Sequence, residues 1–163
     1  MLVAGIGNIF LGDDGFGPEV VRALGEQGAL PEGVRLVDYG IRGMHLAYDL
    51  LEDWDMVVLV DAVPERGSPG RLEVLELTTG GLPEARLDAH AMDPVAVLTS
   101  LEALGGQLPL AFLVGARLSD VDERIGLSTT AADAVAPAVA AVRELLVRAP
   151  QLLAAAENTE KVG

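Results

Sequence analysis

The 163-residue sequence contains no cysteine, which excludes disulfide bonds, thiolate zinc sites and cysteine nucleophiles. Histidine is scarce, with two residues, and neither stands in the His-Glu-x-x-His motif of zincin metalloproteases. The Gly-x-Ser-x-Gly turn of many serine hydrolases is also missing. No apolar run approaches the roughly 20 residues that a membrane helix needs.

Positive charge is in short supply as well. Eleven Lys and Arg residues stand against 25 Asp and Glu residues, for a net charge of −14. Phosphates would repel such a surface, so no nucleic-acid partner is expected. The N-terminus has no basic region before its apolar residues and therefore does not resemble a signal peptide. We expect a cytoplasmic protein with no membrane partner.

Strand and helix signals alternate along the chain. The strand signals fall at residues 1–4, 34–38, 56–61, 71–77 and 109–115, and the helix signals at 18–24, 44–51, 93–103 and 130–148. Strict alternation over 71–77 predicts a half-exposed antiparallel edge strand, whereas the apolar runs predict buried parallel strands. The order predicts an α/β fold, a three-layer α/β/α sandwich with a mostly parallel sheet. We expect a single α/β domain over 1–150 and a frayed tail over 151–163.

The most informative segment is the glycine-rich loop over residues 5–17, Gly-Ile-Gly-Asn-Ile-Phe-Leu-Gly-Asp-Asp-Gly-Phe-Gly, between the first strand and a helix. Loops that leave the carboxyl ends of such strands bind ligands. Phe10 stands where a dinucleotide-binding loop needs its third glycine, so no nucleotide is expected. Asp13 and Asp14 favour a cation or acid–base chemistry. We expect one of them to face the cleft and the other to cap the helix or stay solvated.

Two further acids follow predicted strands. Asp61 ends the most apolar strand, where an unpaired buried carboxylate would be costly, and this favours a functional role over a turn or a helix cap. Asp38 ends the second strand, and there a functional role and a turn are equally compatible with the pattern. Both acids should lie at the same sheet edge as Asp13 and Asp14.

The histidines and the second loop leave more than one interpretation open. His90 lies in a loop before a helix that Asp93 is expected to cap, and it could be a metal ligand or an ordinary surface residue. His45 is expected on the exposed side of a short helix. The Gly40–Gly43 segment could bind a peptide or carboxylate through its amides and Arg42, or form only a tight turn.

These motifs, in this order, resemble those of the nickel–iron hydrogenase maturation proteases, over nearly the whole chain to about Arg148. The resemblance rests on the opening Gly-x-Gly-Asn-x-x-x-x-Asp-Asp-Gly-x-Gly motif, Gly40-Ile41-Arg42-Gly43-Met44, Val60-Asp61-Ala62, His90, Val114-Gly115 and Ile125-Gly126-Leu127-Ser128. It implies a phosphorylase/hydrolase-like α/β/α fold. The family's second loop often has threonine after its first glycine, where this chain has Ile41; this difference suggests a subgroup that acts on a different hydrogenase isoform.

The resemblance also implies an activity. The family removes a C-terminal extension from the hydrogenase large-subunit precursor after nickel insertion, so the nickel arrives with the substrate and the resting enzyme need not hold metal. Its three metal-contacting and catalytic positions fall on Asp14, Asp61 and His90. Candidate substrate contacts are Asp38, Gly40, Arg42 and Gly43. The enzyme is expected to be an aspartic-type, nickel-dependent endopeptidase that acts as a monomer.

Two alternatives stay open. A non-catalytic checkpoint protein could bind the nickel-loaded precursor through the same three residues without cutting it. A peptidyl-tRNA hydrolase begins with a related Gly-x-Gly-Asn strand exit but would need a basic surface, which a pI near 4.3 disfavours.

Overall fold

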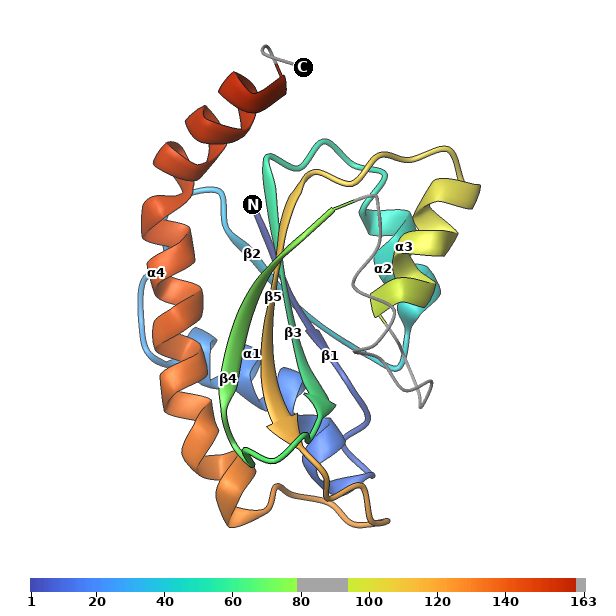
Figure 1. Cartoon of the computed structure of the whole chain (residues 1–163), viewed down its shortest axis with the longest axis vertical. Helices are drawn as coiled ribbons and strands as arrows, with labels where there is room; N and C mark the ends of the chain where they lie inside the picture. Colours follow the sequence, from blue (N-terminus) through green and yellow to red (C-terminus); the bar gives the residue numbers. More distant parts are fainter. Residues whose placement is uncertain (79–93, 161–163) are drawn as a thin grey trace.

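The computed structural model describes residues 1–78 and 94–160, and it places five strands in one sheet in the order β2-β1-β3-β5-β4 (Figure 1). The strands are β1 (Leu2–Ile6), β2 (Arg35–Gly40), β3 (Met56–Pro64), β4 (Leu72–Leu77) and β5 (Leu110–Leu118). Four of them are parallel, and β4 pairs antiparallel with β5 at the sheet edge. The predicted mostly parallel sheet with an antiparallel edge strand is confirmed.

Helices cover both faces of this sheet (Figure 1). One face packs against α1 (Phe16–Glu26) and α4 (Thr129–Glu160), and the other against α2 (Gly43–Asp49) and α3 (Pro94–Ala103). The strand period of two assigns side chains to the two layers: along β3, Val58 and Val60 face α1 and α4, while Val57 and Leu59 face α2 and α3. The three-layer α/β/α sandwich is therefore confirmed.

Strands β2 and β3 continue beyond the acids that were expected to end them. β3 stays paired with β5 as far as Pro64, opposite Leu118, and β2 runs to Gly40. Asp61 and Asp38 thus lie inside strands, near their carboxyl ends. The prediction of the strand ends was wrong because backbone pairing, of β3 with β5 and of β2 with β1, continues after the apolar run stops.

Helix α4 begins at Thr129 and ends at Glu160. Ser128 caps it, two residues before the predicted helix signal at 130–148, since the Ala131 N–H donates to the Ser128 Oγ at 3.2 Å. The predicted end at Arg148 is wrong, and residues 151–160 are helical where a frayed tail was expected. The helix continues through Pro137 and Pro150 because its apolar side packs on the sheet layer, with Leu152 and Leu153 still in contact with the core.

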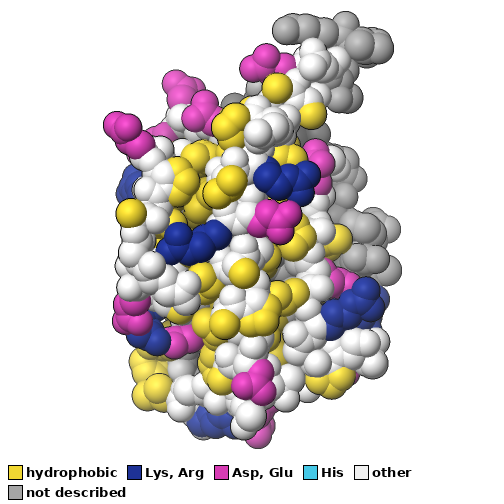
Figure 2. All heavy atoms as spheres, turned by 90° about the vertical axis from the view of Figure 1, so that its left-hand side faces the viewer, with side chains coloured by type: hydrophobic (Ala, Val, Ile, Leu, Met, Phe, Trp, Pro, Cys, Tyr) yellow, Lys and Arg dark blue, Asp and Glu magenta, His cyan; other side chains and the backbone are white. Residues whose placement is uncertain are grey.

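The outer side of the molecule that α4 covers has acidic, basic and apolar groups interspersed (Figure 2). No helix among residues 1–78 and 94–160 is long and apolar enough to cross a membrane.

Glycines allow α1 to lie directly on the sheet. A Cβ on Gly17 would lie 2.2 Å from the Ile6 carbonyl oxygen and 2.3 Å from that of Val60, and a Cβ on Gly5 would lie 2.7 Å from the Gly17 carbonyl oxygen. Such distances are far below van der Waals contact, so both positions require glycine. The start of α1 is thereby fixed against the carboxyl ends of β1 and β3, where the candidate site lies.

Candidate active site

The parallel strands place the candidate site at one edge of the sheet, the lower edge in Figure 1, where β1, β2, β3 and β5 end. The loop after β1 forms a 3-10 turn, η1 (Gly12–Gly15), just before α1. The Gly7 N–H donates to the Gly40 carbonyl oxygen at 3.1 Å and so joins the loop after β1 to the end of β2. Loops far apart in sequence therefore meet around this edge.

Asp14 lies in η1 and is half-buried. Its carboxylate accepts a hydrogen bond from the Asn8 N–H at 2.8 Å. Burial raises the pKa of the Asp14 carboxyl above its ordinary value, and the Asn8 hydrogen bond acts in the opposite direction. The main chain here is tightly packed, because a Cβ on Gly7 would lie 1.8 Å from the Asp14 carbonyl oxygen. The backbone of Asp14 can therefore take this position only because residue 7 is a glycine.

Asp61 belongs to β3, between β1 and β5, and is 6 % exposed. It pairs in register with Gly115 of β5. The turn η1 contacts β3, and Gly17 at the start of α1 lies against Val60, the residue before Asp61. The elements that hold Asp14 and Asp61 are therefore in direct contact at one end of the sheet, as the sequence predicted.

His90 and the predicted cap Asp93 lie outside the described residues. Within residues 1–78 and 94–160 there is no group of three His, Asp or Glu side chains that could hold a metal ion. The three-residue nickel site, of which the described part includes Asp14 and Asp61, stays a prediction. The other histidine, His45, is exposed on α2, as predicted.

Asp13 has a different place from its neighbour. It is 2 % exposed, and its two carboxylate oxygens accept hydrogen bonds from Ser128, from the backbone N–H at 2.7 Å and from the hydroxyl at 2.8 Å. The Arg124 guanidinium lies 3.6 Å from the same carboxylate. The expectation that the second acid would cap α1 or stay solvated is wrong, since Asp13 joins the first loop to the segment before α4.

The second loop uses its polar groups locally. The exposed Asp38 accepts a hydrogen bond from the Gly40 N–H at 2.8 Å, and Arg42 donates through Nε to the Tyr39 carbonyl oxygen at 3.0 Å. Gly40 has a φ of +53°, and Gly43 begins α2. These contacts account for a strand-to-helix turn. Substrate contacts by Asp38, Gly40, Arg42 and Gly43 stay predictions.

Comparison with known proteins decides the family. The model of the hydrogenase maturation protease family matches residues 18–145, a span that begins after Asp14 and includes Asp61 and His90. The chain belongs to the hydrogenase maturation protease family. The hydrogenase 2 maturation protease of Escherichia coli K12 is 32% identical over 155 residues, which cover 91% of this chain and 94% of that protein.

A solved structure agrees with this assignment, and a further relative is named as a hydrogenase subunit. The solved structure of the Escherichia coli hydrogenase maturating endopeptidase HybD superposes with a TM-score of 0.71 at 29% identity and covers 86% of this chain and 88% of that one. The coenzyme F420 hydrogenase subunit delta of Methanothermobacter thermautotrophicus is 40% identical over 82 residues. That match covers 48% of this chain, which spans about half of the relative's length, 52%.

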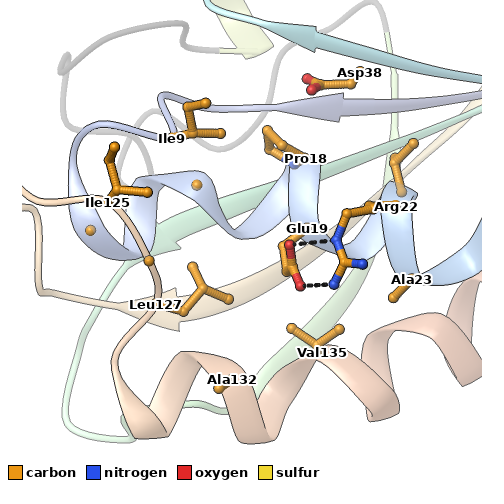
Figure 3. Close-up of a pocket in the computed structure, with 14 residues that line it drawn as sticks. Ile9, Pro18, Glu19, Arg22, Ala23, Asp38, Ile125, Leu127, Ala132 and Val135 are labelled. Carbon is orange, nitrogen blue, oxygen red and sulfur yellow. Dashed lines mark hydrogen bonds and ion pairs between the residues drawn. The ribbon is translucent and has the colours of Figure 1, made fainter.

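An apolar pocket lies beside the first loop of this family member (Figure 3). Ile9, Ile125 and Leu127 line it near η1, while Pro18 and the ion-paired Glu19 and Arg22 line its α1 side. The pocket lining does not include Asp14 or Asp61. Asp38, one of the predicted substrate contacts, also lines this pocket, so the pocket joins the end of β2 to the region of η1.

Sequence reasoning missed Ser128 and Arg124 as partners of Asp13. The hydrogen-bonded residues Asp13 and Ser128 are 115 positions apart. No periodicity or local spacing links such positions. The available signal was weak: Ser128 stands two residues before the predicted helix at 130–148, and a serine near a helix start can act as its cap.

Proposed function

We propose that this chain is the endopeptidase that removes the C-terminal extension from a nickel–iron hydrogenase large-subunit precursor after nickel insertion. Family membership supports the general activity, and the juxtaposition of the elements bearing Asp14 and Asp61 supports the site. One observation carries the most weight. Asp14, in the loop after β1, and Asp61, in β3, lie at the same edge of the sheet in a chain of this family.

The proposed ligand set is Asp14, Asp61 and His90. Two carboxylates and an imidazole offer oxygen and nitrogen atoms, which suit a borderline divalent ion such as Ni²⁺. Three protein ligands leave coordination positions for groups of the precursor itself. The nickel is part of the substrate in this proposal, so the enzyme tests whether the precursor has received its metal before cutting it.

The chemistry assigns different tasks to the metal and the protein. A divalent ion near the scissile carbonyl polarises it toward attack by water. One of the two carboxylates would accept the proton of that water and pass it to the amine that leaves as the C–N bond breaks. Burial, which raises the pKa of Asp14, brings this carboxyl nearer to the range of an effective general base. Asp61 lies on β3, and pairing with β1 on one side and β5 on the other holds the backbone of this strand in place.

The surface around the site suits a protein substrate. Six large apolar side chains are exposed in the loops and helix start that follow β1, β2 and β5: Ile9, Phe10, Ile41, Met44, Val121 and Ile125. They stand at the same edge as the acids. We propose that this apolar collar contacts the folded precursor, which the enzyme binds as a monomer in the cytoplasm.

Mass spectrometry of the precursor tests the function. The purified chain, mixed with nickel-loaded large-subunit precursor from the same organism, should release a C-terminal peptide, while nickel-free precursor should stay intact. Asp14→Asn, Asp61→Asn and His90→Ala should each abolish release. Binding of the loaded precursor without any loss of mass would instead support the non-catalytic checkpoint, and normal cleavage by all three folded variants would exclude the proposed site.

A further inference from the structure

Asp13 is the one acid of the first loop that faces the protein interior. Both of its carboxylate oxygens are used by Ser128, through the backbone N–H on Oδ1 and the hydroxyl on Oδ2. The Arg124 guanidinium lies near Oδ1 and is itself held at 2.8 Å by Asp120. A buried carboxylate needs such partners, and here all of them come from the segment between β5 and α4.

The backbone repeats this connection. The Gly12 N–H donates to the Arg124 carbonyl oxygen at 2.9 Å, and the Asp13 N–H donates to that of Asp120 at 2.7 Å. Leu11 forms a parallel bridge with Arg124. Main chain and side chain therefore fasten the turn η1 to the segment before α4 at consecutive residues.

Ser128 has a second task in the same place. Its hydroxyl oxygen accepts a hydrogen bond from the Ala131 N–H at 3.2 Å and so caps α4 while the hydroxyl donates to Asp13. One side chain thus joins the turn that contains Asp14 to the start of α4, which packs on the sheet core. The neighbouring residue, Asp14, has only the Asn8 N–H as a hydrogen-bond donor to its carboxylate among the contacts of the described residues.

We infer that Asp13 is a positioning residue, which holds Asp14 in its working place by fastening η1 to Ser128 and Arg124. This inference rests on the proposed function, in which Asp14 contacts the nickel of the precursor. The Asp13 carboxylate is occupied by Ser128 and Arg124, so the proposal gives it no contact with the precursor. A small displacement of η1 would move the Asp14 carboxylate, and misplacement by about 1 Å can lower a rate about 100-fold.

The test compares three variants of the full chain. Asp13→Asn removes the charge and one acceptor oxygen, Ser128→Ala removes the hydroxyl, and Ser128→Thr keeps it. At a temperature where circular dichroism shows all three folded, Asp13→Asn and Ser128→Ala should lower kcat for nickel-loaded precursor by about 10- to 100-fold with little change in KM. Ser128→Thr should restore most of the rate. A merely structural role would lower Tm and leave kcat of the folded protein unchanged.

Amide hydrogen exchange gives a measurement that does not depend on activity. Asp13→Asn and Ser128→Ala should accelerate exchange at the Gly12 and Asp13 amides relative to wild type and Ser128→Thr. Unchanged protection of these amides, or a kcat within about twofold of wild type in the folded variants, overturns the inference. If the wild-type chain cleaves no precursor, the proposed function fails, and the exchange data still decide whether Asp13 fastens the turn.

Discussion

Gly17 lies so close to Val60 that a Cβ on Gly17 would be 2.3 Å from the Val60 carbonyl oxygen. This approach sets the start of α1 against β3 at Val60, one residue before Asp61. The glycines of the first loop therefore let the backbone of α1 pack directly on the backbone of the sheet. This packing brings the elements that bear Asp14 and Asp61 together.

Gly17→Ala should destabilise the protein by about 3 kcal/mol or more, because the clash is with backbone atoms that cannot move aside. Urea unfolding measures the change. Gly25→Ala in the same helix is the matched control: its Cβ would meet only Leu36 Cδ1, at 3.7 Å, so it should stabilise α1 by about 0.5–1 kcal/mol. Equal effects of the two substitutions would contradict the packing argument.

Asp14→Asn should separate stability from activity. Burial raises the pKa of Asp14 in the folded protein, so the folded state binds this proton more tightly than the unfolded state. The resulting stabilisation is present below the unfolded pKa, near 3.8, and is lost as the pH rises through the folded pKa. As the pH rises through the folded pKa, the wild type acquires a half-buried charge, and the variant does not.

Unfolding of both proteins at pH 4 and pH 7 checks this. Relative to wild type, Asp14→Asn should gain stability between pH 4 and pH 7, although cleavage falls by about 100-fold or more. Asp55→Asn, on an exposed acid away from this edge, should change neither quantity. A loss of stability in Asp14→Asn that grows toward pH 7 would show that the charged carboxylate is favoured by the fold.

The apolar collar predicts an effect on KM. Phe10 is 60 % exposed and Ile125 76 % exposed beside the site, so Phe10→Ser or Ile125→Ser should raise KM for the precursor about tenfold and leave kcat nearly unchanged. Val147→Ser on α4, where the side chain is 71 % exposed, is the control and should have no effect. An equal increase in KM for all three would mean that the collar is not the docking surface.

The two histidines provide a matched pair. His90→Ala should abolish cleavage of nickel-loaded precursor, because an imidazole ligand of the proposed set is lost. His45→Ala, on the exposed side of α2, should cleave at the wild-type rate. Timed mass spectrometry of the released peptide measures both, and full activity of folded His90→Ala would remove His90 from the site.

The architecture could be predicted from local pattern. Apolar runs such as 56–61 and the alternation over 71–77 depend on which face of a strand is buried, so they indicated a mostly parallel sheet with one antiparallel edge. The positions of Asp14 and Asp61 at one edge followed, because parallel strands end on the same side. Element ends were less predictable: β3 and α4 continue past the residues where their local patterns stop, since pairing with β5 and packing on the core sustain them.

The sequence by itself determined the layers, the edge at which the acids gather and the family. The tertiary structure alone decided how the adjacent acids Asp13 and Asp14 divide their roles. Identical side chains side by side in one loop have the same local propensities. What distinguishes them is Ser128, which lies 115 residues away in sequence and contacts Asp13 in the folded chain, where α4 packs on the sheet.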